Sequence, residues 1–243
     1  MKHNFSIVVF LTSFIFLSCS NDEISSDENL SSLISPDFNL FSRFHDCSIN
    51  SKKNLNDLEQ FIPIFQSNRE FTNNNELYIY IVDNNSLSVS NFILIEQSRK
   101  NKILSSSLEF IKEGSDIFTC NNEDTNSYEV TTLFYQNLSD DIFISEVIDC
   151  KFNEGFNYGT FSVEFDFFIR SLSNYDLAYK VDFMKNQKTP GRFLWQNYFQ
   201  TKEDQFNFFQ KWIKDPASQE IKQIFEEQVQ CFSSSNFKSF KIY

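Results

Sequence analysis

Glycine and proline are scarce in this 243-residue chain, which has only 4 of each. So few glycines leave no Gly-rich loop of the kind that cradles phosphates in nucleotide-binding proteins. The same scarcity excludes collagen-like architecture and long Gly-rich linkers, because both need abundant glycine. We therefore look for neither a nucleotide site nor a fibrous fold.

Positive charge is also in short supply. The chain has 21 Lys and Arg residues against 33 Asp and Glu residues, which gives a formal net charge of −12 at pH 7. An acidic protein repels phosphate backbones, so we expect no nucleic-acid partner. The chain is instead rich in Phe, with 31 residues, and its 41% hydrophobic content predicts a globular protein with an aromatic core.

The N-terminus has the pattern of a secretory signal over residues 1–18. Its apolar run, residues 5–17, is too short for an ordinary membrane-spanning helix. The run ends in Leu17-Ser18-Cys19, and here the segment resembles a bacterial lipoprotein leader. The resemblance implies that Cys19 is lipidated and that the lipid anchors the protein in a membrane. The alternative is an ordinary cleaved signal followed by a chance cysteine.

Residues 19–36 are rich in Ser, Asp, Glu and Asn. Such a segment cannot bury enough apolar area to order itself, so we expect a flexible tether. By the same lipoprotein resemblance, Ser20 after the cysteine favours the outer membrane. The expected location is thus an exported outer-membrane lipoprotein that faces the periplasm or the cell surface.

Two stretches of the chain repeat one another. DCSIN at 46–50 and DCKFN at 149–153 both read Asp-Cys-x-apolar-Asn, and each follows a short apolar run. A second cysteine closes each copy, since Cys120 lies 73 positions after Cys47 and Cys231 lies 81 positions after Cys150. The repeat predicts a duplicated chain with copies at 37–136 and 137–243.

The apolar periodicity of both copies predicts the order β-α-β-β-α-β. In the first copy we expect strands at 38–47, 77–82, 91–96 and 128–135, with helices at 54–66 and about 102–112. In the second copy we expect strands at 142–149, 177–184, 193–199 and 237–243. Its helices are expected at about 158–172, after a cap at Thr201, and from Pro216 to near Cys231.

Units with this order resemble the ferredoxin-like fold, and two such units facing each other resemble the dimeric α+β barrel superfamily. The predicted fold class is therefore α+β, with two tandem modules packed as an intrachain barrel in a monomer. That superfamily includes cofactor-free monooxygenases, haem-handling enzymes and non-catalytic members. We find no catalytic motif of any of them in this chain, so the resemblance indicates a fold and leaves the activity open.

The ferredoxin-like resemblance also implies a disulfide pairing. In such a unit the first and fourth strands are antiparallel neighbours, so the end of strand one lies beside the start of strand four. Cys47 and Cys150 end first strands, and Cys120 and Cys231 precede fourth strands. We therefore expect Cys47 to pair with Cys120 and Cys150 with Cys231, as suits an exported protein.

Few residues can carry chemistry. Only His45 remains among the histidines once the leader is removed, which excludes sites that need two histidines. We expect no metal, no cofactor and no catalytic residue. Arg43, His45 and Glu146 are the polar residues that we nominate for the wall of a cavity between the two sheets. Alignment of the repeats sets Arg43 opposite Glu146, and this predicts an ion pair between them.

The leading functional interpretation is a lipid-anchored envelope protein, not expected to be an enzyme, whose barrel is structural or binds an unknown ligand or protein. The alternative is an enzyme, or a haem- or small-ligand-binding protein, that uses the cavity between the two sheets. A surface module for adhesion or assembly is a third possibility, which a large exposed apolar patch would favour. The polarity of the cavity wall distinguishes them, because an enzyme needs convergent polar groups there.

Overall fold

The computed structural model describes residues 36–67, 75–83, 91–99, 106–121, 126–139, 141–172, 175 and 177–243. The predicted leader, Cys19 and nearly all of the tether lie outside these residues. In the described part of the chain, no helix is both long enough and apolar enough to cross a membrane.

Nine described strands form one sheet in which every pairing is antiparallel. The strands are β1 (Leu40–Ile49), β2 (Asn75–Val82), β3 (Asn91–Arg99), β4 (Phe118–Cys120), β5 (Asn126–Gln136), β6 (Ile142–Phe152), β7 (Tyr179–Asn186), β8 (Arg192–Phe199) and β9 (Val229–Lys241). Their order is β3-β2-β9-β6-β8-β7-β5-β1, and β1 pairs back with β3, so the eight strands close into a ring. The short β4 pairs with the end of β1.

The same order of pairing occurs twice around this ring. The first half of the chain has the order β5-β1-β3-β2, and the second half has β9-β6-β8-β7. The halves are joined where β5 pairs with β7 and where β9 pairs with β2. Ser42 of β1 lies opposite Tyr128, and Ser145 of β6 lies opposite Phe237, the two positions that alignment of the repeats makes equivalent. The predicted α+β class is therefore confirmed.

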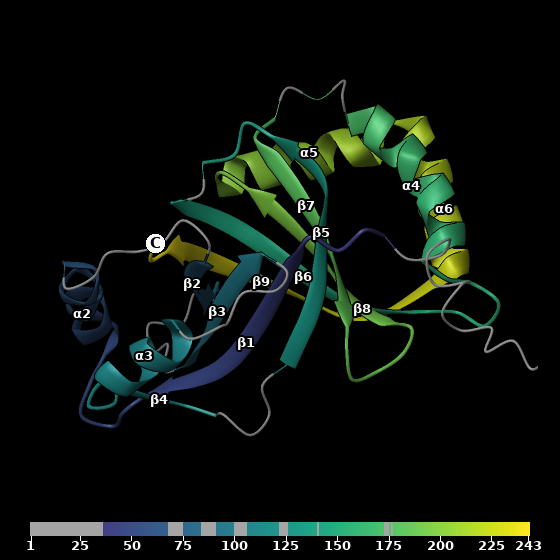
Figure 1. Cartoon of the computed structure of the whole chain (residues 1–243). Coiled ribbons are helices and arrows are strands. Elements are labelled where there is room, and N and C mark those ends of the chain that lie inside the picture. Colours follow the sequence, from purple (N-terminus) through teal and green to yellow (C-terminus); the bar gives the residue numbers. More distant parts are fainter. Residues whose placement is uncertain are drawn as a thin grey trace, which may run out of the picture. The chain divides into compact units, whose positions relative to one another are not determined.

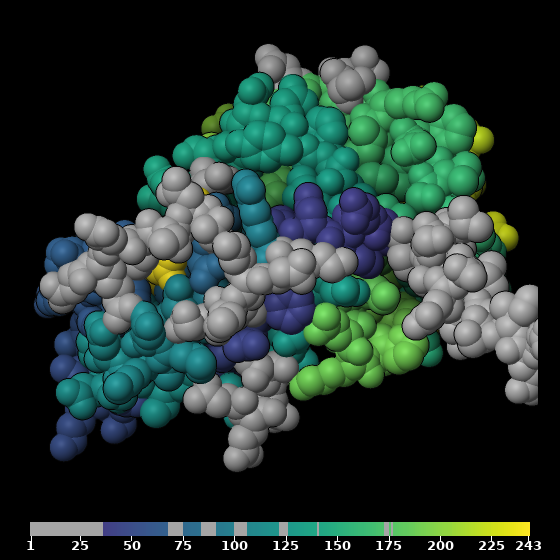
Figure 2. Space-filling view, viewed as in Figure 1, coloured from purple at the N-terminus to yellow at the C-terminus, as the bar shows by residue number. Residues whose placement is uncertain are grey.

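The helices cover the outer face of the sheet, as Figure 1 shows. They are α2 (Leu55–Ser67), α3 (Ser106–Glu113), α4 (Tyr158–Leu172), α5 (Lys202–Lys214) and α6 (Pro216–Gln228). Side chains of α2 and α3 pack with strands of the first half, and side chains of α4, α5 and α6 pack with strands of the second half. In Figure 2 the purple side chains of β1 lie between teal side chains of the first half and green ones of the second.

The inside of the ring is filled by aromatic and polar side chains. Tyr78, Tyr80, Phe143, Tyr198 and Phe237, which come from four strands of both halves, pack together there. The space left among them is about 10 Å³, which is room for about one water molecule. Among the described residues, then, the predicted cavity between the two halves of the sheet is too small for a ligand.

The C-terminal strand differs most from its prediction. We expected it to begin at residue 237, but β9 begins at Val229, and α6 ends at Gln228 rather than near Cys231. Residues 233–236 are Ser-Ser-Ser-Asn, a run with little intrinsic strand preference, and they extend because they pair with β6. Tertiary pairing therefore overrides local propensity here. The short β4 also has no counterpart among the predicted strands.

Candidate functional site

A cavity of about 500 Å³ lies on the outer face of the second half, between the sheet and the helices α4, α5 and α6. Its wall is mainly aromatic, with rings that include Phe161, Phe168, Trp195, Phe208, Trp212 and Phe225. Both tryptophans of the chain therefore line it. We call this space the α4–α6 pocket. Its volume falls in the range of small-molecule sites, which are concave and mostly apolar.

Local sequence patterns determine the buried face of α4 and the first residues of α5 and α6, the helices that form this pocket. The buried residues of α4 recur at helical spacing, which turns one aromatic stripe toward the sheet. Thr201 caps α5 in a capping box with Asp204, since each side chain bonds to the backbone of the other residue. Asp215 caps α6, and Pro216 occupies its first turn. The starts of α5 and α6 are therefore fixed by side chains adjacent in sequence.

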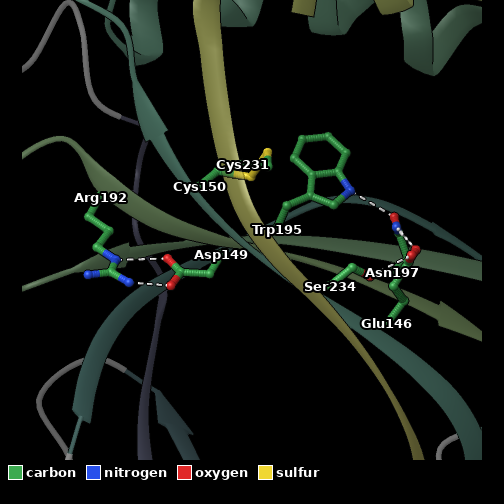
Figure 3. Close-up of a disulfide and its surroundings, with 8 residues drawn as sticks. All are labelled: Glu146, Asp149, Cys150, Arg192, Trp195, Asn197, Cys231 and Ser234. Atoms are coloured by element: carbon green, nitrogen blue, oxygen red, sulfur yellow. Dashed lines mark hydrogen bonds and ion pairs between the residues drawn. A yellow bond between two sulfur atoms is a disulfide. The ribbon is translucent and has the colours of Figure 1, made fainter. Parts of the chain in front are cut away.

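A short polar network forms one part of the pocket wall (Figure 3). The Oδ1 atom of Asn197 accepts hydrogen bonds from Trp195 Nε1 at 2.8 Å and from the Tyr179 hydroxyl at 2.7 Å. Asn197 Nδ2 donates to Glu146 Oε2 at 2.8 Å, and Ser234 Oγ donates to Glu146 Oε1 at 2.9 Å. Because Oδ1 has two donors and Nδ2 faces a carboxylate, the network fixes the orientation of the amide.

The network is buried and anionic at one end. Asn197 is 6% exposed and Tyr179 is 2% exposed. Burial, together with the negative charge of Glu146, raises the pKa of Tyr179 well above its usual value. The phenol therefore stays protonated and donates to Asn197. At the pocket rim, Lys222 and Glu226 form an exposed ion pair on α6 with an N–O distance of 3.3 Å.

A disulfide forms another part of the wall. Cys150 is bonded to Cys231, and Cys47 is bonded to Cys120, which is the predicted pairing. The paired Cα atoms lie 4.0 and 3.9 Å apart, because each bridge joins directly opposed residues of neighbouring strands. Cys150 and Cys231 both line the α4–α6 pocket. The bridge thus ties the start of β9, just after α6, to the end of β6.

The three residues nominated for a cavity between the sheets do not lie there. His45 is buried under α3, where its Nε2 atom is 3.1 Å from Ser107 Oγ. Arg43 lies on the same face of β1 as His45, because side chains alternate along a strand. Glu146 also points outward from the ring, but in the second half of the sheet, toward Asn197 and the helices that cover that half. The nomination was therefore wrong for all three.

The predicted ion pair between Arg43 and Glu146 is likewise wrong. Arg43 lies opposite Glu96 and Ser127, whereas Glu146 lies opposite Asn197 and Asn236. The repeat makes the two positions equivalent, but β1 and β6 belong to different halves of the ring. The two residues therefore lie under different sets of helices. Glu96 is itself fully buried and accepts hydrogen bonds from Ser107 of α3.

Asn197 and Tyr179 are the residues that sequence reasoning missed, and the sequence assigned Glu146 to a different cavity. The sequence predicts that the aromatic residues form the core, and the alternative function places a ligand site between the two sheets. The available signal was the pair Gln196-Asn197 inside the apolar strand 193–199, since a polar residue on the buried face of a strand needs a partner. Nothing in the sequence indicated that Glu146 was that partner.

The resemblance to the superfamily raises the question of a haem site. The residues of the described pocket wall do not fit haem. Haem iron is usually held by His, Met, a Cys thiolate or Tyr. The described wall has no His and no Met, and its two cysteines are bonded to each other. Tyr179 is a protonated phenol committed to Asn197. Nor do the described residues contain a group of three or more His, Cys, Asp or Glu that could hold a metal ion.

No protein-family model and no curated protein matches the sequence. Several solved structures do match the fold. A protein from Lactobacillus acidophilus described as a monooxygenase has a TM-score of 0.58 at 12% identity, and the match covers 84% of this chain and 95% of that one. A second protein described as a monooxygenase, from Fusobacterium nucleatum, has a TM-score of 0.56 at 8% identity, covering 86% and 94%.

A chlorite dismutase variant from Candidatus Nitrospira defluvii, in complex with cyanide, has a TM-score of 0.55 at 10% identity, covering 85% and 93%. These likenesses show the fold. The similar structures are described as enzymes, and this corrects the expectation of a non-catalytic role. They agree better with the alternative of an enzyme or a small-ligand-binding protein.

Proposed function

We propose that this protein binds an apolar aromatic small molecule, as ligand or substrate, in the α4–α6 pocket. The observation that carries the proposal is a space of about 500 Å³ walled by aromatic rings from three helices and the sheet. Protein interiors rarely leave voids much larger than a water molecule. An apolar space of ligand size with a few convergent polar groups is therefore best explained as a binding site.

An enzymatic role is consistent with this pocket, because the similar solved structures are described as a monooxygenase or a chlorite dismutase. The side chain of Asn197, held in place by Tyr179 and Glu146, supplies a polar group at the wall of the pocket, as a catalytic site requires. The lack of a fitting axial ligand in the described part of the pocket wall argues for chemistry or binding without haem. We therefore place the function in the pocket of the second half rather than between the sheets.

Filling the pocket should abolish ligand binding. Val229, 8% exposed, lines the α4–α6 pocket, so a Val229→Phe substitution adds a ring to the space that the ligand would occupy. We expect the affinity for fluorene, a planar aromatic hydrocarbon, to fall at least about tenfold, because overpacking a complementary site costs on the order of 1–3 kcal/mol. Quenching of fluorescence from Trp195 and Trp212 measures the binding.

A matched control is Val163→Phe, which makes the same change at an exposed site of α4. Val163 is 57% exposed and is not part of the pocket wall. Its affinity for fluorene should equal that of the unmodified protein. Equal binding of fluorene by all three proteins would place the function elsewhere, and so would an unmodified protein that binds neither fluorene nor the corresponding ketone, 9-fluorenone.

We further propose that the chain is a duplication of two ferredoxin-like modules, 37–136 and 137–243. The support is the repeated strand order and the equivalent positions of Ser42 and Ser145. The two disulfides are compatible with an exported protein. We also propose a lipid anchor at Cys19, which rests on the resemblance of the N-terminal segment to a lipoprotein leader.

The anchor can be tested at Cys19. A Cys19→Ala protein has no thiol to carry a thioether-linked lipid, so we expect it to leave the membrane fraction for the soluble fraction. An Asn21→Ala protein keeps the thiol and should stay with the membranes. Fractionation followed by immunoblotting measures both. Membrane association of the Cys19→Ala protein at the unmodified level would rule out the lipid anchor.

A further inference from the structure

We propose that the ligand of the α4–α6 pocket carries one hydrogen-bond acceptor, of the kind found in an aromatic ketone, and that Asn197 holds this atom through its side-chain N–H. The inference rests on the proposed function of the pocket. It adds the chemical class of the ligand and the end of the ligand that faces Asn197.

The amide of Asn197 has a donor to spare. A primary amide has two N–H groups, and Nδ2 of Asn197 has one partner, Glu146 Oε2, among the described residues. The Oδ1 atom already accepts from Trp195 and from Tyr179, so the amide cannot turn round without losing both bonds. Asn197 is 6% exposed and lines the pocket. Its second N–H is therefore a buried donor at the wall of an apolar space.

The other donors near this wall are already committed. The indole N–H of Trp195 and the hydroxyl of Tyr179 both point to Asn197. The ammonium group of Lys222 lies at the rim, in its ion pair with Glu226. Among the described residues of the wall, a ligand inside the pocket thus meets mainly aromatic rings and a single uncommitted N–H. A planar aromatic molecule with one acceptor oxygen matches that pattern, because rings stack on rings and a buried N–H is costly to leave unpaired.

Glu146 acts in this arrangement as a positioning residue. Its carboxylate accepts from Asn197 Nδ2 and from Ser234 Oγ, and it does not itself line the pocket. By binding one N–H of the amide it holds the amide plane, and so directs the other N–H. Figure 3 shows the hydrogen bonds that link Trp195 to Asn197 and Asn197 to Glu146, with Ser234 beside the carboxylate.

The test compares 9-fluorenone with fluorene, which have the same ring skeleton and differ in the carbonyl group. Both tryptophans line the pocket, so quenching of tryptophan fluorescence gives both dissociation constants. We expect the unmodified protein to bind the ketone about tenfold more tightly, the upper end of what one hydrogen bond contributes. The readout is the ratio of the two constants within one protein, which a general weakening of the pocket does not change.

The decisive variant is the double substitution E146Q/N197D. It exchanges the amide and the carboxylate, so that residue 197 still accepts from Trp195 and Tyr179 and now accepts from residue 146. The net charge is unchanged, but no N–H is left to face the ligand. We expect its ketone preference to be lost or reversed, because an acceptor oxygen would now face a carboxylate.

The matched control is E146Q alone. The new amide can present its oxygen to Asn197 Nδ2, so Asn197 keeps its orientation and the tenfold preference should remain. Equal binding of the two compounds by the unmodified protein, or a preference retained in E146Q/N197D, would overturn the assignment of Asn197 while leaving the pocket as a site for hydrocarbons. Binding of neither compound would overturn the proposed function and this inference together.

Discussion

An Asp182→Ala substitution is expected to lower the free energy of unfolding by about 3 to 5 kcal/mol, because it leaves a buried lysine without its counter-ion. The Asp182 side chain is fully buried inside the ring of strands. Its Oδ2 atom lies 3.0 Å from Lys180 Nζ, and the Lys180 side chain is only 15% exposed. Chemical denaturation with guanidinium chloride measures the loss.

The carboxylate of Asp182 also satisfies two hydroxyl groups. Thr132 donates to Oδ1 and Tyr198 donates to Oδ2, both at 2.7 Å. Burial, and then the nearby charge of Asp182, raises the pKa of Tyr198 well above its usual value, so this hydroxyl keeps its proton and needs an acceptor. Alanine provides none, and the cost of the unpaired groups adds to that of the unpaired ammonium.

Asp149→Ala is the matched control, because it breaks an ion pair in which the partners are accessible. Asp149 bonds to Arg192 through both guanidinium Nε and Nη2, and the two side chains are 22% and 45% exposed. We expect a loss of about 1 kcal/mol or less, as for surface pairs in general. A double variant, Lys180→Met with Asp182→Leu, should recover the part of the loss that comes from the unpaired ammonium, since it removes both buried charges, but not the part that comes from the hydroxyls of Thr132 and Tyr198. Similar losses for Asp182→Ala and Asp149→Ala would contradict this account of the interior.

The strand and helix order was predictable because hydrophobic periodicity is local. The helix α4 occupies the predicted residues 158–172, since its buried phenylalanines recur along one face. The exception is the beginning of β9, where Ser-Ser-Ser-Asn extends only by pairing with β6. Pairing partners are a property of the fold, and a single-sequence pattern contains no signal for them.

The position of the pocket was less predictable, because the two halves share a topology but differ in packing. In the first half, Phe61 and Phe65 of α2 pack with Phe110 of α3 and Phe118 of β4. The chain turns so closely there that a Cβ atom at Gly114 would lie 2.2 Å from the Phe118 ring. In the second half, the space between the sheet and the helices α4, α5 and α6 stays open as the α4–α6 pocket. Both halves are rich in phenylalanine, so composition does not distinguish a filled face from a hollow one.

The residues of the polar network explain why the candidate site was missed. The sequence nominates Glu146 for the wall of a cavity between the sheets and as a partner of Arg43, which assumes that both residues face a shared cavity. Whether residue 146 faces the inside of the ring or the helices depends on the register of β6 with β8, which sets Glu146 opposite Asn197. A shift of one residue would exchange the two faces. The repeat identified the equivalent positions correctly, but not the side of the sheet that they face.

Replacing both cysteines of one disulfide with alanine should lower the free energy of unfolding by about 4 kcal/mol for either bridge. The bridges close segments of nearly equal length, with sequence separations of 73 for Cys47–Cys120 and 81 for Cys150–Cys231. In the chain-entropy account, a bridge acts by restricting the unfolded chain, and the restriction grows only slowly with loop length. The two double variants should therefore be destabilised to a similar extent.

The bridges lie in different halves, so their effects should add. A variant that lacks the four bridged cysteines should lose about 8 kcal/mol, which is comparable with the whole stability of an ordinary domain. We expect it to be largely unfolded at 25 °C, while each double variant stays folded. Urea denaturation followed by circular dichroism measures all three, and the dependence of stability on urea should steepen as bridges are lost, because the unfolded chain becomes more exposed. An unchanged unfolding midpoint in either double variant would show that its bridge does not constrain the chain as the structure indicates.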